Sequence, residues 1–532
     1  MSRAIDSIFR SFHICCRLSR RTMTTRSYRE AIDTLNSLQS NAAALDLVRA
    51  TGGRSSAFAI PEMIEYLGII GYKPADLNAL NVIHITGTKG KGSTSAFTDS
   101  ILREAHPEWT IGLYTSPHLI AVRERIRVNG KPLSEEDFSR FFFEVWDKIE
   151  TNKVRSSLRL ETTPDKPGYF RFLTLVAYHA FLSLKVDATI LEVGVGGAHD
   201  STNIVPRPIV TGITALGIDH VNVLGKTLAE IAWQKGGIFK QGVPALTVSQ
   251  PPEGLEVLKQ QATDLKASEF KVVSSIPQLS EIELAHVLPG LAGKHQQQNA
   301  TLAVHLAQTF LRAQEGSLSD TDVLPPVIVR GLEKARWPGR CQTVEDPVYT
   351  NTTWYLDGAH TLESLECCVQ WFASPGVGLR SEIGKPQRRI LIFNCTSGRS
   401  GASFLDAIHS HIKSQLQIFG SDETPSLFFD HVVFCTNVTY VDGGFKGDLT
   451  SLAIPESDLT HLKTQHQLSA AWSELIPTFP AENVHVLPSI QHAVNLIRQF
   501  DKSDGDHTAV LVTGSLHLVG GVIEVADLSF SL

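Results

Sequence analysis

The segment "HITGTKGKGSTSAF", residues 84–97, places glycines, lysines and hydroxyl residues between an apolar run and a helix-like stretch. In a strand–loop–helix arrangement of this kind, backbone N–H groups and a helix N-terminus surround phosphate oxygens. Glycines let the backbone approach the anion, a lysine reaches the outer phosphates and a hydroxyl binds Mg²⁺. The pattern predicts a nucleotide phosphate site formed by Gly87, Thr88, Lys89, Gly90, Lys91, Gly92 and Ser93, with Lys91 as the phosphate lysine and Ser93 as the hydroxyl.

This loop is a variant of the usual phosphate loop. When Gly90-Lys91 is aligned on the G-K of the pattern G-x-x-x-x-G-K-[ST], Ile85 stands at the first glycine and Gly92 at the hydroxyl. The alternative interpretation is that the glycines only form a turn. We favour phosphate binding, because an apolar strand, a glycine loop and a helix follow one another in the required order.

Two more polar residues come at the ends of apolar runs. Glu192 ends the run "ATILEV", and His220 follows "VTGITAL". Ligands of open α/β sheets bind at the carboxyl edge of the strands, where these side chains are expected. Oxygen ligands suit Mg²⁺, and one imidazole is acceptable beside them. Taken alone, Glu192 could instead be an edge carboxylate paired with a lysine, and a single histidine is more often structural.

The elements that must position these residues follow an α/β order. Short apolar runs such as "NVIHIT" and "ATILEVGV" alternate with helical segments such as "STSAFTDSILREA" and "FRFLTLVAYHAFLSL". The alternation predicts a mostly parallel sheet covered by helices on both faces, and the last of these segments is expected to be a buried helix. Residues 251–288 are expected to be less regular.

A second α/β region follows the segment "KARWPGRCQ", in which Pro338 and Gly339 indicate a hinge. The alternation restarts in "TWYLDGA", "RRILIFNCT" and "TAVLVTGSLHL". The predicted fold class is α/β, with an N-terminal P-loop-type domain of mostly parallel sheet at residues 31–340 and a smaller C-terminal Rossmann-like α/β domain at residues 341–532. A length of 532 residues agrees with two or three domains.

The composition excludes several classes of function. With 42% hydrophobic and 19% charged residues, the chain is typical of a globular protein and not of a disordered one. A net charge of −7 provides no broad basic surface for nucleic acid. No apolar run reaches membrane-spanning length. The seven cysteines form neither a disulfide framework nor a zinc pattern, which indicates a reducing compartment.

The first thirty residues differ from the rest of the chain. They contain seven arginines among serines and threonines, and only Asp6 and Glu30 are acidic. This composition is typical of a mitochondrial presequence, and the alternative is a disordered basic tail. Met23 could serve as a second start and yield an untargeted form. We therefore expect the protein in the mitochondrion, in the matrix or at the inner membrane, and in the cytoplasm.

Several motifs carry a resemblance to a known family across residues 67–518. They are "HITGTKGKGSTSAF", "YTSPHL", "RERIRVNGKPLSEEDF", "ILEVGVGGAHDSTNIV", "GITALGIDHVNVLGKTLAEIAWQKGGIFK", "RWPGRCQ", "YLDGAHT" and "VTGSLHLVGG". Together they resemble the folylpolyglutamate synthase family of the Mur ligase superfamily. Members of that superfamily are ATP-dependent enzymes that join an amino acid to a carboxylate.

The resemblance implies a site with ATP and two Mg²⁺ ions, and it admits a monovalent cation such as K⁺. Ser93 and Ser116 would complete the first magnesium site, Glu192 would join the two metals, and His220 would bind the second. The match to "IAWQKGGIFK" implies that Lys235 is carbamylated, which makes it an anion able to support the second magnesium. Lys91, Lys235 and His220 are thereby the implied catalytic residues.

The family also implies contacts with ATP from beyond the phosphate loop. Arg340 of "RWPGR" and both Asp357 and His360 of "YLDGAH" would reach ATP from the second domain, and Asn299 of "HQQQNA" would approach the adenine. Each has an alternative as a linker charge or a turn residue. Nucleotide contact is favoured because binding clefts often lie between domains.

The implied activity is the addition of L-glutamate to the γ-carboxylate of a reduced folate, with ATP as the third substrate and a monomer as the expected state. One rival is dihydrofolate synthase, which attaches the first glutamate to dihydropteroate by the same chemistry. Another is a protein that only binds nucleotide. Folate and glutamate contacts are not assigned near Ala198, His199 and Ser400, where the chain departs from the family pattern.

The stretch "RERIRVNGK" suggests where a growing polyglutamate tail could lie. In an extended strand, alternate side chains share a face, so Arg123, Arg125 and Arg127 are expected to lie together. Such a cationic face could guide an anionic tail. The alternative is a solvated strand face with no ligand, because exposed charges are common.

Overall fold

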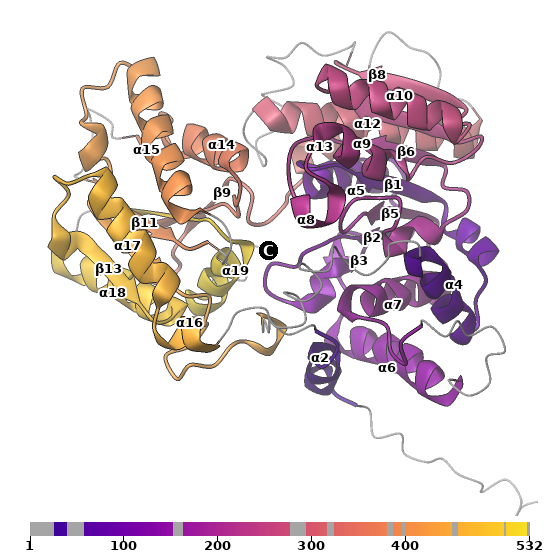
Figure 1. Cartoon of the computed structure of the whole chain (residues 1–532), viewed down its shortest axis with the longest axis horizontal. Coiled ribbons are helices and arrows are strands. Elements are labelled where there is room, and N and C mark those ends of the chain that lie inside the picture. The colour runs from indigo at the N-terminus through magenta and orange to yellow at the C-terminus, as the bar shows by residue number, and fades with distance from the viewer. Residues whose placement is uncertain are drawn as a thin grey trace, which may run out of the picture.

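A computed structural model of the chain describes residues 26–39, 58–152, 163–276, 294–316, 324–379, 387–395, 400–449, 456–504 and 507–528. These residues form two sheet domains that lie side by side (Figure 1). Most of the expected presequence, including Met23, lies outside the described residues. The first described helix, α2 (Tyr28–Asn36), begins inside the last part of that segment.

The N-terminal domain contains an eight-stranded sheet with the order β4-β3-β2-β5-β1-β6-β7-β8. Strand β3 pairs antiparallel with β2 and β4, and the other neighbours are parallel. The strands that follow β1 in the chain, β2 and β5, lie on one side of it, and β6 lies on its other side. Open α/β sheets bind ligands at the carboxyl edge where the strand order reverses in this way. The strands are β1 (Val82–Thr86), β2 (Ile111–Tyr114), β3 (Ile126–Val128), β4 (Lys131–Pro132), β5 (Ala188–Glu192), β6 (Val210–Ile213), β7 (Pro244–Val248) and β8 (Glu269–Val273).

Helices cover both faces of this sheet, as the alternation predicts. Val82 packs with helices of one face, whereas Ile83 and Ile85 pack with helices of the other. The first face carries α4 (Ala59–Ile69), α6 (Glu135–Asn152), α7 (Tyr169–Leu184), α9 (Leu228–Gly236) and α10 (Pro252–Asp264). The second face carries α5 (Lys91–Ala105), α12 (Lys294–Glu315) and α13 (Pro326–Lys334). The prediction of a buried helix at α7 is confirmed.

Residues 251–276 are more regular than expected. Helix α10 begins directly after Pro251, with Pro252 in its first turn, and β8 follows. Proline is a turn signal in sequence, but it is also favoured at the first helical position because its missing N–H would have no helical partner there. The prediction of an irregular segment is therefore wrong for this part, while residues 277–288 lie outside the described residues.

The C-terminal domain contains a six-stranded sheet with the order β13-β12-β11-β14-β10-β9, in which only β9 is antiparallel. Its strands are β9 (Gln342–Glu345), β10 (Thr352–Leu356), β11 (Gln387–Phe393), β12 (His431–Cys435), β13 (Val484–Leu487) and β14 (His507–Thr513). Helices α14 (Leu362–Phe372), α15 (Gly401–Ile418) and α17 (Lys463–Leu475) pack on one face, and α18 (Ile490–Asp504) and α19 (Leu516–Val525) pack on the other. The α/β class with two sheet domains is thus confirmed.

A loop of the first domain is packed into the core of the second. Leu119 and Ile120 are buried in the cluster that contains α18 and α19. A Cβ atom at Gly520 of α19 would lie 1.8 Å from the carbonyl oxygen of Leu119, so the close approach requires glycine. The domains are also joined by the connection between α13 and β9. None of the described helices has both the length and the apolar character needed to cross a bilayer.

Candidate active site

The glycine loop joins the carboxyl end of β1 to the first turn of α5. Gly87 and Gly90 have φ angles of 149° and 86°. A Cβ atom would lie 1.8 Å from Oγ1 of Thr214 at the first position and 2.0 Å from Oδ1 of Asn299 at the second. Both positions therefore require glycine. Because α5 begins at Lys91, its N–H groups lie at the carboxyl edge of the sheet, as a phosphate site requires.

Two lysines converge on this loop. Nζ of Lys91 donates to the carbonyl oxygen of Gly87 over 3.0 Å, and Nζ of Lys235 donates to the same oxygen over 2.8 Å. Lys235 lies on α9 and is buried. Burial, reinforced by the nearby charge of Lys91, lowers the pKa of Lys235 well below its usual value. The structure thus brings both predicted catalytic lysines to Gly87.

Glu192 lies at the carboxyl end of β5, next to β1. Its side chain is only 3% exposed, and its Oε2 accepts a hydrogen bond from the backbone N–H of Ser116 over 2.9 Å. Burial raises the pKa of Glu192 to about 7, against the attraction of Lys91. The structure therefore places two of the predicted metal ligands in direct contact, and Ser93 is buried in the first turn of α5.

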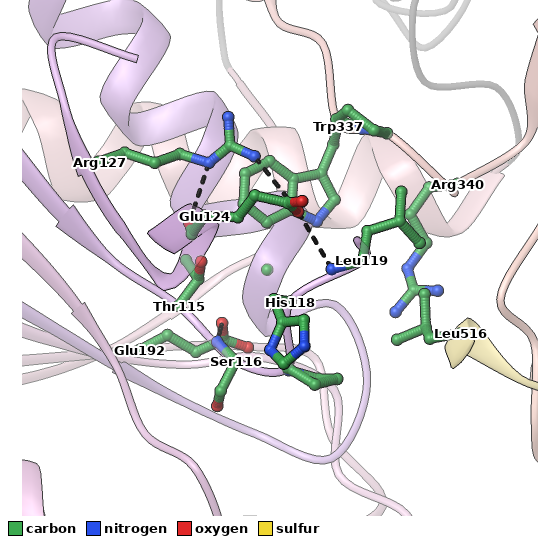
Figure 2. A pocket seen from close by; sticks show the side chains of 13 residues that line it. Thr115, Ser116, His118, Leu119, Glu124, Arg127, Glu192, Trp337, Arg340 and Leu516 are labelled. Carbon is green, nitrogen blue, oxygen red and sulfur yellow. Dashed lines mark hydrogen bonds and ion pairs between the residues drawn. The ribbon is translucent and has the colours of Figure 1, made fainter. Parts of the chain in front are cut away.

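A pocket opens between the two domains in front of Glu192 (Figure 2). The segment Thr115–Leu119 and Arg127 line it from the first domain, and Leu516 lines it from α19. The hinge contributes Trp337 and Arg340. Gly92 also lines the pocket, so the phosphate loop and Glu192 share one cavity.

Trp337 anchors the hinge to the first domain. A Cβ atom at Gly92 would lie 3.0 Å from Nε1 of its indole, so the ring covers the start of α5. The guanidinium of Arg127 lies over the ring at 5.3 Å from its centroid, which is a cation–π distance. Figure 2 shows the two side chains next to each other. Gly339, two residues later, has a φ of 73° and turns the chain toward the second domain. The predicted hinge therefore lies at the pocket.

The second domain brings Asp357 and His360 to its own carboxyl edge, directly after β10. The Asp357 carboxylate accepts hydrogen bonds from the N–H groups of Cys341 and Ala359, over 2.8 and 2.9 Å. Nδ1 of His360 lies 3.0 Å from the carbonyl oxygen of Gly358. The turn after β10 is thus held rigidly close to the hinge.

Two contacts connect the phosphate loop to other elements. Nζ of Lys89 donates to Oγ1 of Thr361 in the second domain over 2.6 Å. Nδ2 of Asn299, on α12, donates to Oε1 of Gln296 over 2.9 Å, which directs its other amide atom toward Gly90. The structure therefore places Asn299 beside the phosphate loop.

His220 does not line the pocket that contains Glu192. It is exposed at the start of the short helix α8 (Val221–Leu224), with a φ of 51°. Although burial opposes the effect, His220 and Lys89 lower the pKa of the neighbouring Asp219. Among the described residues, no three His, Cys, Asp or Glu side chains form a group that could hold a metal ion.

The prediction that Arg123, Arg125 and Arg127 share a cationic strand face is wrong. Arg123 and Arg125 belong to a 3₁₀ turn, Val122–Arg125, and the strand β3 begins only at Ile126. The Glu124 carboxylate accepts hydrogen bonds from three successive N–H groups, at residues 119–121, and thereby curls the chain. Arg125 and Arg127 are buried, so the three arginines do not share an exposed face.

Sequence reasoning did not identify three residues of this site: His118, Glu124 and Trp337 line the pocket but had no assigned role. The signals were present, because all three lie inside motifs that carry the family resemblance, "YTSPHL", "RERIRV" and "RWPGR". Their convergence depends on contacts between segments far apart in the chain.

Curated proteins provide an independent comparison. The chain is 42% identical to a folylpolyglutamate synthase of Neurospora crassa over 519 residues, which covers 96% of this chain and 93% of that protein. It is also 42% identical to a folylpolyglutamate synthase of Saccharomyces cerevisiae over 516 residues, covering 95% and 88% of the two proteins. No protein-family model matches the chain.

Solved structures have the same fold. A Mycobacterium tuberculosis folylpolyglutamate synthase, complexed with ADP and AMPPCP, matches with a TM-score of 0.64 at 23% identity, covering 88% of this chain and 95% of that one. Escherichia coli FolC in complex with DHPP and ADP matches with a TM-score of 0.62 at 23% identity, covering 95% and 99%. Given its identity to the two fungal proteins over nearly their whole length, the chain belongs to the folylpolyglutamate synthase family.

Proposed function

We propose that the chain is an ATP-dependent ligase that adds L-glutamate to the γ-carboxylate of the terminal glutamate of a reduced folate, releasing ADP and phosphate. The observation that carries the proposal is the shared pocket of the phosphate loop and the buried Glu192 at the domain boundary. The sequence identity to named folylpolyglutamate synthases supports the same activity.

The reaction needs the carboxylate to be activated, because a carboxylate is a poor acylating agent. An oxygen of the folate γ-carboxylate attacks the γ-phosphorus of ATP, ADP leaves, and an acyl phosphate forms. The amine of glutamate then attacks the acyl carbon, phosphate leaves with the electron pair of the C–O bond, and the amine loses a proton. Lys91, at the loop, is suited to stabilise charge on the transferred phosphoryl group.

The residues present fit magnesium. Glu192 is a buried carboxylate whose pKa is raised to about 7, so a nearby cation would stabilise its charged form. Ser116, whose backbone N–H donates to Glu192, and Ser93, in the first turn of α5, carry hydroxyl oxygens that suit Mg²⁺. Mg²⁺ is usually held by one or two carboxylates together with water and substrate phosphates. Bound there, Mg²⁺ would neutralise charge on the phosphates. His220 is the candidate for a second ion.

Lys235 suits the carbamate that the family resemblance implies. Only a neutral amine attacks CO₂, and burial beside Lys91 favours the neutral amine. The step is the addition of the amine to CO₂, which forms an N–C bond and releases one proton. The resulting anion would lie next to the Lys91 ammonium, because both nitrogens contact the carbonyl oxygen of Gly87.

One experiment tests the ligase proposal. Purified protein is incubated with MgATP, L-glutamate and either tetrahydrofolate monoglutamate or dihydropteroate. The masses of the products are then measured by mass spectrometry. We expect glutamate added to tetrahydrofolate, with one ADP released per addition. Addition to dihydropteroate alone would make the chain a dihydrofolate synthase. ADP release that is independent of folate and glutamate would contradict a ligase.

We also propose that residues 1–30 direct the protein to mitochondria and that initiation at Met23 yields a cytoplasmic form. The proposal is supported by the arginine-rich and acid-poor composition of this segment. A reporter fused to residues 1–30 is expected to enter mitochondria, whereas the same reporter with a segment beginning at Met23 is expected to stay in the cytoplasm. Identical distributions would contradict the proposal.

A further inference from the structure

Helix α2 is fixed to the first domain. The ring of Tyr28 packs edge-on against Phe138 of α6, with centroids 5.5 Å apart. Just before the helix, Arg26 forms an ion pair with Asp147, also on α6. The apolar side of α2 belongs to the same buried cluster as α6 and α7. Helix α2 therefore moves with the N-terminal domain.

The same helix also contacts the second domain. Oη of Tyr28 donates a hydrogen bond to Oδ1 of Asp448, and Nδ2 of Asn36 donates to the carbonyl oxygen of Gly447 over 2.9 Å. Both acceptors belong to the 3₁₀ turn Gly447–Leu449, and Asp448 is 8% exposed. Burial and the Asp448 carboxylate raise the pKa of Tyr28, so its hydroxyl remains a neutral donor. In Figure 1, α2 accordingly lies beside the boundary between the domains.

Asp448 also connects helix α2 to the wall of the pocket. The same Oδ1 accepts a hydrogen bond from the backbone N–H of Val122 over 2.7 Å. The backbone carbonyl oxygen of Asp448 lies 2.8 Å from Nε2 of His118, which lines the pocket. One residue of the second domain thus joins Tyr28 of α2 to the loop that forms the pocket wall.

The hydrogen bonds of His118 define its protonation state. Nε of Arg125 donates to Nδ1 of His118 over 2.9 Å, and an arginine nitrogen can only donate. Nδ1 must therefore accept, and Nε2 must carry the proton that it donates to Asp448. His118 is a neutral imidazole held between the two domains, so its contribution is to position the pocket wall and not to exchange protons.

We propose that α2 is a strap that holds the second domain against the pocket wall, with Tyr28 and Asp448 as positioning residues for His118. When the strap is loosened, the turn at Asp448 separates from the loop that it braces, and the pocket wall loses its fixed geometry. Lys91, Lys235 and Glu192 belong to other segments, so we expect substrate binding to weaken more than the chemical step. The proposal depends on the proposed function only where ligase turnover is measured.

The first test is hydrogen–deuterium exchange on the full-length protein. Tyr28→Phe keeps the ring against Phe138 and removes only the hydroxyl. The matched control, Tyr66→Phe, removes a buried hydroxyl that donates to the carbonyl oxygen of Pro164 over 2.6 Å within the first domain. We expect exchange at residues 118–125 and 446–449 to become about tenfold faster in Tyr28→Phe, since the lost bond is to a charged acceptor. The control should leave these segments unchanged. Equal exchange in the two variants would overturn the strap.

The second test uses turnover. For Tyr28→Phe we expect KM for the folate substrate to rise about three- to tenfold, with kcat within about twofold of the wild type. Combining Tyr28→Phe with Asp448→Ala should raise KM no further than Asp448→Ala alone, because both changes remove the same contact. Additive effects, or a fall in kcat at constant KM, would contradict the proposal. If the wild type has no ligase turnover, the proposed function fails, and exchange still decides the strap.

Discussion

The carboxyl edges of the two sheets are built from different chemistry. At the edge of the first sheet, the buried Glu192 and Lys235 and the partly buried Lys91 are ionisable, and the pKa of Glu192 and of Lys235 is shifted. At the edge of the second sheet, the ends of β11, β12 and β14 carry a cluster of buried neutral side chains, whereas the buried carboxylate Asp357 follows β10. Asn394, Asn437, Gln465 and Ser515 form a hydrogen-bonded chain with distances of 2.9, 3.0 and 3.5 Å.

The difference shows how the work is divided between the domains. A buried charge is unfavourable unless it is paired, so the first edge holds groups whose state depends on pH, cations and substrate phosphates. A neutral network that is fully hydrogen-bonded fixes side-chain positions without depending on pH. We infer that the first edge carries charge-dependent chemistry and that the neutral network after β11, β12 and β14 provides a rigid wall.

The comparison between the two edges is tested most strongly by removing the positive charge of Lys91, the predicted phosphate lysine. Lys91→Ala is expected to reduce ligase turnover about 1000-fold, because a preorganised donor is lost from the transferred group. Its thermal unfolding should change little, since the lysine contacts the loop and not the core. Lys259→Ala, an exposed lysine on α10, is the control and should keep full turnover. Turnover within tenfold of the wild type in Lys91→Ala would refute its role.

The second largest effect is expected at Lys235. Lys235→Ala should lose about 100-fold in turnover, as expected for a residue that supports metal ligands. A short-chain carboxylic acid added to the assay should restore part of the activity by replacing the missing carbamate. Lys240→Ala is the matched control, because Lys240 also donates to a backbone carbonyl, that of Asn203 over 3.1 Å. The turnover of Lys240→Ala should not increase when the carboxylic acid is added. Full activity of Lys235→Ala would exclude the carbamate.

A third measurement uses the pH dependence of the free energy of unfolding to follow the protonation of Glu192. Its pKa is raised from 4.5 to about 7, so between these values the folded state keeps a proton that the unfolded state has released. The stabilisation is complete below the unfolded pKa and is lost as pH rises through the folded pKa. In metal-free protein, the free energy of unfolding should fall by about 2 kcal/mol from pH 5 to pH 7 relative to Glu192→Gln. Parallel curves for the two proteins would show that Glu192 titrates normally.

The smallest effect is expected at the second edge. Gln465→Ala removes an amide that donates to Oδ1 of Asn394 over 2.9 Å, which should lower the free energy of unfolding by about 1 kcal/mol. The loss should be the same from pH 5 to pH 8, since none of the linked groups ionises. Gln260→Ala, an exposed amide paired with Asp264, is the control and should be neutral. If the loss of unfolding free energy in Gln465→Ala depended on pH, it would contradict the distinction between the ionisable groups of the first edge and the neutral network of the second.

Sequence reasoning succeeded where the signal is local. The loop from Gly87 to Ser93 and the strand ending at Glu192 are each encoded within a few neighbouring residues, so their place at the sheet edge could be predicted. Helix α9 could be predicted as well, but the burial of Lys235 could not. It depends on how α9 packs against the loop, and from composition alone this lysine would have been assigned to the solvent.

Long-range contacts explain what was missed. Lys89 and Thr361 are 272 residues apart, and only the docked domains bring them together. The arginines of "RERIRV" show the opposite failure. Their alternation predicts a strand, but the Glu124 carboxylate binds the preceding N–H groups and forms a turn instead. Such local competition by an acidic side chain overrides a periodic pattern.

The order of strands in the second sheet governs how a newly synthesised chain acquires its pocket. Strand β14 (His507–Thr513) lies between β10 and β11, although it is the last strand to leave the ribosome. Domains generally fold as units during synthesis, with the N-terminal one first. The second sheet therefore lacks its middle until β14 has been synthesised, and Leu119 and Ile120 have no complete partner domain before then. Molecular chaperones that bind exposed apolar segments would act on the nascent chain at this stage.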